Sequence, residues 1–534
     1  MSTLILAMRQ PSDVRPLVRV LLAAGMLGLT GCAVGPDFRP PAPPAAQGYA
    51  PQAMPSQTAA AADPLGAAQH FDPQRDIPAD WWTVFHSARL DALIRRAMQA
   101  NPGIASAQAA LKQAQEYVYA QQGYFYPTVG LSYSPSRQQL AGNMGGNSPG
   151  IQGNGTIIQT YQNPAGPAPY NGPVIYTFHT AQLTVGYTPD VFGANRRQVE
   201  SLQAQADMQR YQLEAARVTL ASNIVAAALQ EAALRAQIDA VKAMIADSQR
   251  ALGILQRQLS SGYAMRIDVA AQESTLAVAQ QQLPPLERQL QQTRDLLRVL
   301  AGNTPDQDVE HFSMDDFRLP QQLPESLPSQ LVRQRPDVLA AEEQMHAASA
   351  NVGVAVAARL PQFSIVGAVG GEASVFNQMF QSGGPFWALV GNITQPVFDG
   401  NTLLHRERAA DQALVQAAAQ YRQTVLTALQ NVADTLHALH ADADGMAAAV
   451  RAEQAARVTL DLTRKQNIAG YVNLLVLLSA EQNWLQAHIA LIQARSQRLG
   501  DTAALYQALG GGWWNTLPAK DQPAGASPHA GGQS

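Results

Sequence analysis

Apolar residues recur at alternating steps of three and four through two long stretches, the spacing that places a seam along one side of a helix. The first seam contains Ile238, Val241, Ile245, Ser248, Leu252, Leu255 and Leu259, and it resumes in Leu283, Leu286, Leu290, Thr293, Leu297 and Leu300. The second contains Val425, Leu429, Val432, Leu436 and Leu439, and a returning helix is expected from Asn473 to about Leu509. No proline interrupts residues 194–260, so this helix alone would extend about 100 Å. Such a rod does not fit in a compact globular domain.

Each rod turns back on itself at a glycine followed by a tyrosine. The first turn lies at residues 260–263, with Gly262 and Tyr263, and the second at 469–471, with Gly470 and Tyr471. The pattern therefore predicts two long helical hairpins. The prolines at 284 and 285 predict a break or an offset in the first returning helix.

The two halves of the chain are related by an internal duplication. Pro336 and Pro361 each follow an equivalent proline, Pro102 and Pro127, by 234 residues. The Val-Phe pair at 397–398 follows the pair at 191–192 by 206 residues, and the Gly-Tyr turns are 208 residues apart. The fall from 234 to 206 predicts an insertion of 28 residues in the first copy, before its Val-Phe pair.

The hydrophobic period changes from helix to strand within each copy. Large apolar residues alternate with small polar ones at 128–134 and at 182–188 in the first copy. The second copy has Phe363, Ile365 and Val369 in one strand and Trp387, Leu389 and Ile393 in its partner, with a less polar opposite face. The first pair is joined by a polar loop at about 136–175, which we expect to face the cell exterior, and the second pair by about 371–384.

Four strands of about ten residues with aromatic ends have the length that a transmembrane β-barrel requires. Four strands cannot close a barrel, because an open edge in lipid leaves backbone groups unpaired. The chain is therefore expected to oligomerise, and geometry alone permits a dimer, a trimer or a larger ring. The alternative is a soluble helical protein with two exposed hairpins.

The N-terminus has the pattern of a secretory signal, with three arginines before the apolar run at 20–29. This run leads into Leu-Thr-Gly and then Cys32, the only cysteine, which resembles a bacterial lipobox in which the thiol takes lipid. The alternative is a lone buried thiol. Residues 33–78 are rich in proline and alanine and are expected to form an extended strap.

Composition and motifs argue against a nucleic-acid-binding protein and against an enzyme. Only 14% of the 534 residues are charged, and the net charge is −4, or −6 without residues 1–31, which carry three arginines and one aspartate. No basic cluster is present, so we expect no nucleic-acid partner. His437 and His440 precede two aspartates, but a calcium loop through them would need an acid at Arg451, so a solvated helix face is preferred. No phosphate loop or nucleophile elbow occurs, and no cofactor or metal is expected.

The motifs jointly resemble the TolC-like outer-membrane efflux factors, especially the OprM and NodT lipoprotein branch. The resemblance is carried by the segment from Cys32 to Phe38, the Trp81-Trp82 opening with Phe85, the Asn-Pro and Arg-Pro-Asp turns, and the duplicated order of helix, two strands and long helices. It implies a homotrimer with a twelve-stranded barrel in outer-membrane lipid, continuous with a long periplasmic tunnel of helices. It also implies a periplasmic adaptor protein and an inner-membrane pump of the resistance-nodulation-division or major-facilitator type.

The expected fold class is thus mixed α and β, with a four-stranded contribution to a trimeric β-barrel continuous with an α-helical barrel. The expected segments are a lipoprotein signal peptide at 1–31, a lipid-anchored strap at 32–78, a first repeat at 79–302 with its hairpin at 124–189, a linker at 303–325, a second repeat at 326–512 with its hairpin at 361–398, and a disordered tail at 513–534.

At the gate this sequence departs from the resemblance. The family carries acids shortly after the second tip turn, where this chain has Val476 and Ser479. In the first repeat the place six residues after Gly262 is Asp268, with Arg266 nearby, and this pair is expected to supply charge or a salt bridge; a solvated turn charge is the alternative. We expect an apolar constriction from Leu474 and from Leu477 or Leu478 to close the channel.

The function implied is passive efflux of drugs or other small toxic compounds from the pump and adaptor to the outside. The alternative is an outer-membrane duct for a polypeptide in type I secretion. A lipoprotein enzyme or scaffold, the third possibility, predicts a monomer.

Overall fold

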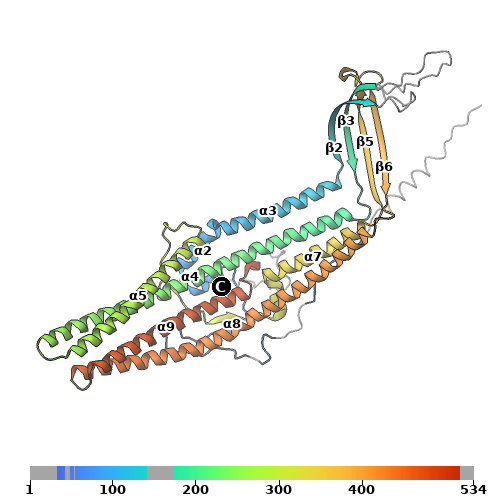
Figure 1. Cartoon of the computed structure of the whole chain (residues 1–534). Helices are drawn as coiled ribbons and strands as arrows, with labels where there is room; N and C mark the ends of the chain where they lie inside the picture. The colour runs from blue at the N-terminus through green and yellow to red at the C-terminus, as the bar shows by residue number, and fades with distance from the viewer. Residues whose placement is uncertain (1–32, 43–47, 53, 141–173, 517–534) are drawn as a thin grey trace, which may run out of the picture. The chain divides into compact units, whose positions relative to one another are not determined.

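The structure is a computed structural model that describes residues 33–42, 48–52, 54–140 and 174–516 (Figure 1). It contains two compact units, each assembled from separate segments of the chain. The strand unit comprises the N-terminal segment to Arg39 together with Ala114–Gln205 and Met345–Gln416. The helical unit comprises Pro40–Gln113, Ala206–Gln344 and the chain from Ala417 onward.

The elements follow the order expected from the duplication. The first copy contains η1 (Trp81–Phe85), α2 (Ala88–Ala100), α3 (Pro102–Gln122), η2 (Gly123–Phe125), β2 (Thr128–Leu140), β3 (Val174–Tyr187), α4 (Ala194–Ser260) and α5 (Arg266–Leu300), after β1 (His70–Asp72). The linker and second copy contain η4 (Met314–Asp316), β4 (Gln322–Pro324), α6 (Pro328–Gln334), α7 (Pro336–Ala357), β5 (Gln362–Ala373), η5 (Phe376–Gln378), β6 (Pro385–Thr394), α8 (Thr402–Ile468), α9 (Leu474–Ala508) and η6 (Trp513–Thr516). In the described part of the chain no helix combines the length and the apolar character needed to span a membrane.

Equivalent elements of the two copies have matching lengths and starting points. The helices α4 and α8 contain 67 residues each, and α5 and α9 contain 35 each. Strand β5 begins at Gln362, which follows Thr128 at the start of β2 by the same 234 residues that separate the matched prolines. The internal duplication predicted from the sequence is confirmed.

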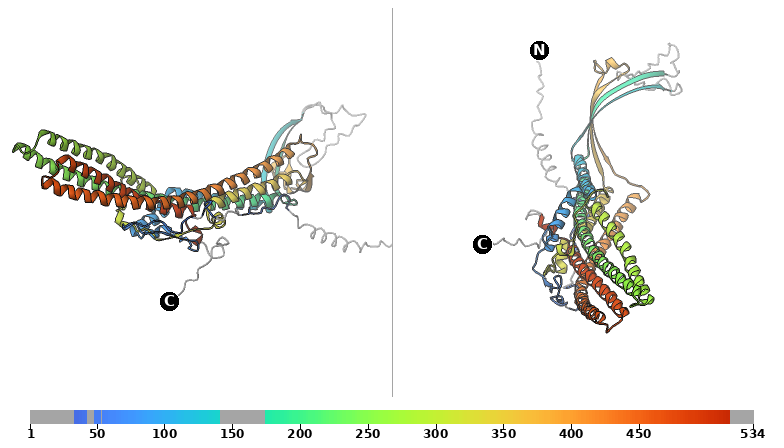
Figure 2. Two further views of the ribbon diagram at one scale, coloured as in Figure 1. Left: turned by 90° about the horizontal axis from the view of Figure 1, so that it is seen from below. Right: turned by 90° about the vertical axis from the view of Figure 1, so that its left-hand side faces the viewer.

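The strand unit contains one antiparallel sheet in the order β2-β3-β5-β6. The register pairs Leu131 with Leu183, Leu183 with Val369, and Val369 with Trp387, so these four residues share one face. Figure 2 shows β2 and β3 bending along their length. Strands β2 and β6 form its two edges, and neither has a further partner strand among the described residues.

The helical unit buries the predicted seams. All seven positions from Ile238 to Leu259 are buried or half-buried, as are the six in α5, and α8 buries Val425, Val432, Leu436 and Leu439. In Figures 1 and 2 the paired helices α4 and α5 run alongside α8 and α9 within this unit. The core also includes the Trp81 and Phe85 side chains of η1, which are at most 1% exposed.

The predicted break at the two prolines is not found, because α5 runs through Pro284 and Pro285 as one helix. The prolines remove two N–H donors, and the carbonyl groups left without them belong to Gln280 and Gln281. All four residues are exposed, so water can bond the freed carbonyls.

Two predicted boundaries need correction. Strand β2 runs to Leu140 and β3 starts at Val174, so residues 136–140 and 174–175 of the predicted loop at 136–175 belong to strands. The other residues of that loop lie outside the described part of the chain. Residues 513–516 do not belong to the tail predicted at 513–534, because Trp513 and Trp514 are buried and the Trp513 indole donates to the Gln334 carbonyl at 2.7 Å; the rest of that segment lies outside the described residues. The helical periodicity ends at the glycines at 510–512, so no pattern in the sequence indicated a further ordered element at the tryptophan pair.

Candidate functional site

The two faces of the sheet differ in chemistry. Large exposed apolar side chains alternate along the strands on one face: Val129, Leu131, Tyr133, Leu183, Val185, Ile365, Val369, Trp387, Leu389 and Ile393. The opposite face carries mostly small or polar residues, including Ser132, Thr184 and Asn392, and its second half is less polar because Val366 pairs with Val390. This arrangement suits a wall with lipid on one side and water on the other.

Both helical hairpins turn through the same backbone motif. Gly262 and Gly470 adopt φ values of 78° and 79°, the left-handed region that favours glycine. The N–H of Tyr263 donates to the Gln258 carbonyl at 2.8 Å, and the N–H of Tyr471 donates to the Gln466 carbonyl at 2.9 Å. A second bond in each turn comes from the glycine N–H, so both turns are Schellman motifs. Both tyrosine side chains are more than 80% exposed.

The charged residues after the first turn act on the helix end. The Asp268 carboxylate accepts from the Met265 N–H at 3.1 Å and caps the start of α5. No ion pair joins it to the exposed Arg266 within the described residues, so the salt bridge considered for this pair is not formed here.

The residues after the second turn divide between the protein interior and its surface. The Asn473 side chain caps α9 by accepting from the Val476 N–H at 3.1 Å. Leu474 and Leu477 are half-buried, whereas Leu478 is buried against its own chain and is unavailable to an aqueous constriction. Ser479 is exposed, and so are Val476 and its neighbour Leu475. The exposed apolar surface after this turn therefore consists of Leu475 and Val476.

An ionic cluster that the sequence reasoning missed joins the two hairpins. Arg464 of α8 lies 3.7 Å from a carboxylate oxygen of Asp247 on α4 and 3.5 Å from one of Glu481 on α9. Burial raises the pKa of the Glu481 carboxyl, and the charge and hydrogen bond of Arg464 oppose that shift. Glu481 occupies a buried position three residues after Leu478. A charged residue at the spacing of the buried face of α9 is the sequence feature that could have predicted this cluster.

A second missed residue, Arg498, holds the proline-rich strap. Its guanidinium is fully buried and donates to the Ala67 carbonyl at 2.7 Å and to the Thr58 hydroxyl at 3.1 Å. One helical turn away, Arg495 forms an ion pair with Asp63 of the same strap. Burial lowers the pKa of the Arg498 guanidinium, while the charges of Asp442 and Asp63 oppose that shift. Residues 58–67 of the strap predicted at 32–78 are thus bound to α9.

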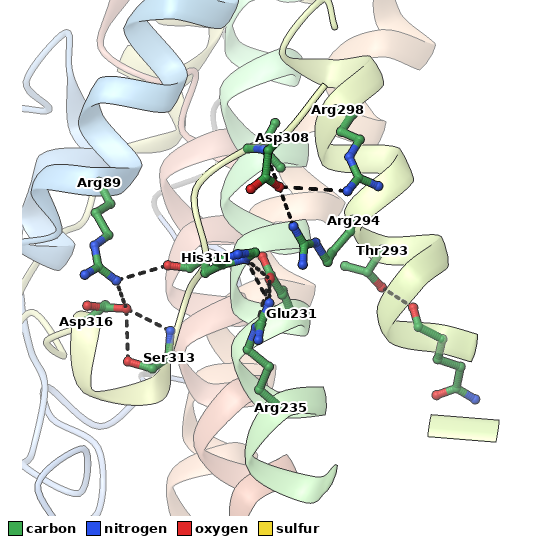
Figure 3. A network of polar contacts seen from close by, with 12 residues as sticks. Arg89, Glu231, Arg235, Thr293, Arg294, Arg298, Asp308, His311, Ser313 and Asp316 are labelled. Carbon is green, nitrogen blue, oxygen red and sulfur yellow. Dashed lines mark hydrogen bonds and ion pairs between the residues drawn. The ribbon is translucent and has the colours of Figure 1, made fainter. Parts of the chain in front are cut away.

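The linker between the repeats is held by the polar network in Figure 3. His311 contacts Arg235 at 2.9 Å and lies 3.6 Å from the fully buried carboxylate of Glu231, both on α4. Asp308 pairs with Arg294 of α5 at 2.6 Å, and Asp316 pairs with Arg89 of α2 at 3.5 Å. The linker therefore ties α2, α4 and α5 together.

The remaining sequence candidates are placed as follows. Cys32 lies outside the described residues, but the segment after it is fixed: the Val34 N–H donates to the Phe192 carbonyl at 3.1 Å, and Asp37 pairs with Arg197 at 2.7 Å. His437 is exposed as expected for a solvated face. His440 is half-buried and its ring lies 5.3 Å from that of Phe71, so it belongs to the strap contact instead. The described residues contain no group of three or more His, Cys, Asp or Glu side chains that could hold a metal.

Comparison with known proteins agrees with this architecture. The family described as outer membrane efflux protein matches residues 93–303 and 327–511. The pyoverdine export outer membrane protein OpmQ of Pseudomonas putida is 29% identical over 442 residues, covering 82% of this chain and 89% of its own. The cation efflux system protein CusC of Escherichia coli is 24% identical, covering 91% and 97%.

Solved structures show the same fold. The outer-membrane channel OprN matches with a TM-score of 0.75 and 25% identity, over 90% of this chain and all of its own. The open-state channel MtrE of Neisseria gonorrhoeae matches with a TM-score of 0.73 and 22% identity, over 90% and 99%. The predicted mixed, internally duplicated fold class is confirmed, and the fold is that of channel proteins. The chain therefore belongs to the outer membrane efflux protein family.

Proposed function

We propose that the protein is the outer-membrane exit duct of a tripartite efflux system and acts as a homotrimer without catalysis. The observation that carries the proposal is a four-stranded sheet with one apolar face, one mostly small and polar face, and two unpaired edges. Three copies would supply twelve strands, enough to close a barrel around an aqueous lumen. The small side chains on the inner face leave room for passage.

The relatives support small molecules as cargo. Their names refer to export of pyoverdine, efflux of toluene and efflux of cations. We propose drugs or other small toxic compounds for this chain, delivered by a periplasmic adaptor and an inner-membrane pump of the resistance-nodulation-division or major-facilitator type. A type I secretion duct is the alternative, and a secreted polypeptide that accumulates on deletion of the gene would favour it.

The resting channel is proposed to close through an apolar constriction after the second tip turn. The constriction was expected at Leu474 and at Leu477 or Leu478, but Leu478 is buried and the other two are half-buried. We therefore assign it to Leu475 and Val476, which are 57% and 47% exposed in the protomer, so three copies would bring six apolar side chains to the entrance. An apolar ring of this kind can exclude water without an acidic ring. Asp268 caps the start of α5 and does not contribute to this constriction.

The N-terminus is proposed to be cleaved before Cys32, whose thiol takes lipid. The fixed position of Val34 and Asp37 on the strand unit supports an anchor at that unit. Cys32→Ala should abolish incorporation of labelled palmitate while leaving the trimer able to assemble, because the barrel itself also holds the protein in lipid. Unchanged labelling would refute the anchor.

The duct is tested by complementation of a deletion strain. Loss of the gene should increase susceptibility to the exported compounds, and the wild-type gene should restore resistance.

Leu389→Lys, on the apolar face, should fail to assemble, because a lysine facing lipid costs about 2–4 kcal/mol near the bilayer centre. Asn392→Lys, on the opposite face of the same strand, is the matched control and should assemble. Equal assembly of both variants would contradict the assignment of the faces.

A further inference from the structure

The internal duplication predicts two copies of one apolar contact, and only the first copy is formed within the chain. Phe192, after β3, packs near Phe363, at the start of β5, with ring centroids 6.3 Å apart. Phe398 follows Phe192 by 206 residues, and Val129 precedes Phe363 by 234, so these two residues are the equivalent pair. They are 91% and 65% exposed. The second copy of the contact lacks its partner inside the protomer.

The strands repeat this asymmetry. β3 pairs with β5 within the sheet, and the equivalents of these strands are β6 and β2. β6 and β2 are the two edges of one four-stranded sheet, with β3 and β5 between them, so they cannot pair within one flat protomer sheet. Each edge can instead pair with the other edge strand of a second copy of the chain. This inference rests on the oligomer proposed above.

The duplication also gives the register of that pairing. Within the chain Tyr187 pairs with Ile365. Adding 206 to the first number gives Ile393, and subtracting 234 from the second gives Leu131. Both residues lie on the apolar face, as directly opposed residues must.

A second register, shifted by two residues, is also compatible with the duplication. The two hairpins differ by two residues, because Thr128 pairs with Gly186 whereas Gln362 pairs with Thr394, two beyond the equivalent position. If the equivalence of β3 and β6 followed that shift, Ile393 would face Tyr133. This pair also lies on the apolar face, so the alternation of faces does not separate the two registers.

Barrel closure separates them. A line perpendicular to the strands passes from Thr128 through Gly186, Val366 and Val390. In the first register it meets the partner's Ser134, a stagger of six residues per protomer, which in a twelve-stranded ring corresponds to a strand tilt of roughly 46°. In the second register the stagger is eight residues and the tilt roughly 54°. Tilts of about 35–45° are typical, so the first register is favoured.

We propose that β6 of one protomer pairs antiparallel with β2 of a second copy in the register that places Ile393 opposite the partner's Leu131. In the same interface Phe398 packs on the partner's Val129, repeating between chains the contact that Phe192 makes with Phe363 inside one chain. The pairing removes both sheet edges and covers two apolar side chains that are exposed in the single protomer.

Cysteine cross-linking between differently tagged chains tests the register. Chains carrying Ile393→Cys and chains carrying Leu131→Cys are co-expressed, purified from the outer membrane and oxidised. Directly opposed residues have Cβ atoms about 4.5–5.5 Å apart, close enough for a disulfide after slight adjustment, whereas diagonal ones are 7–8 Å apart. The mixture should form a dimer carrying both tags, and replacing Leu131→Cys by Tyr133→Cys should lower the yield at least about fivefold. Each singly substituted chain expressed alone should form none.

The intrachain pair Tyr187→Cys with Ile365→Cys is the matched control, because its residues face each other in the known ladder. Its disulfide should close without a change in oligomer mass and sets the maximum yield. A higher yield with Tyr133→Cys, or no interchain dimer while the control closes, would overturn the proposed register. Native mass spectrometry of each variant is recorded first: a monomer would refute the proposed oligomer itself, and a trimer with the wrong cross-link would refute only the register.

Discussion

Arg498→Met should release the strap from α9. The guanidinium makes two short hydrogen bonds, to the Ala67 carbonyl at 2.7 Å and the Thr58 hydroxyl at 3.1 Å, and bonds from a charged donor contribute about 1.5–3 kcal/mol each. Methionine has a similar length and removes the desolvation cost of a buried cation, which offsets part of that loss. We therefore expect the strap to lose about 3 kcal/mol of its docking free energy, a factor of roughly 150 in its opening equilibrium.

Amide hydrogen exchange measures this opening at two reporters. The Thr58 N–H donates to the Gln69 carbonyl at 2.9 Å, and the Gln69 N–H donates to the Thr58 hydroxyl at 3.0 Å. Both should exchange about 100-fold faster in Arg498→Met. The exposed Arg422 of α8 provides the control, and Arg422→Met should leave both rates unchanged. Wild-type exchange rates in Arg498→Met would show that other contacts hold the strap and that Arg498 does not.

Three further predictions concern the turns, the pH dependence and the gate. Gly470→Ala should destabilise the tip by about 1–2 kcal/mol, because alanine is strained at φ 79°, and amide exchange in the turn should accelerate about tenfold. Gly445→Ala, inside α8, is the control and should instead stabilise that helix. Equal effects of the two substitutions would contradict a special backbone requirement at Gly470. Burial and the neighbouring carboxyl of Asp501 raise the pKa of Asp442 to about 7, so the folded state retains a proton that the unfolded chain releases near pH 4. Stability should therefore fall as pH rises from about 4 to 7 and then level off, and Asp442→Asn should flatten thermal unfolding measured across that range; an unchanged slope would refute the assignment. Replacing Leu475 and Val476 together by serine should increase the resting conductance. A variant channel as closed as the wild type would refute an apolar constriction at these residues.

The sequence predicted the parts of the fold that depend on periodicity. The three-four spacing identified the buried face of α4 and α8, and the alternation at 128–134 identified the apolar face of β2. The Gly-Tyr turns were predicted where each helical run stops and restarts, and each glycine adopts the left-handed conformation that glycine tolerates at low cost.

Periodicity could not supply the contacts between segments distant in the sequence. It could not show that Arg498 reaches the strap, since the pattern gives the face of a helix and not its partner. It also ended β2 too early, because residues 137–139 are Arg-Gln-Gln, and pairing with β3 holds them in the strand despite their polarity. At the tip the spacing could not distinguish the exposed Leu475 from the buried Leu478, because both belong to one apolar run.

Conductance of the purified oligomer in a planar bilayer tests whether three copies form a passive duct. We expect discrete current steps that need no energy source and that become larger or more frequent when Leu475 and Val476 are both replaced by serine. Protein confirmed as a trimer that gives no current steps in either form would show that the oligomer is not a duct.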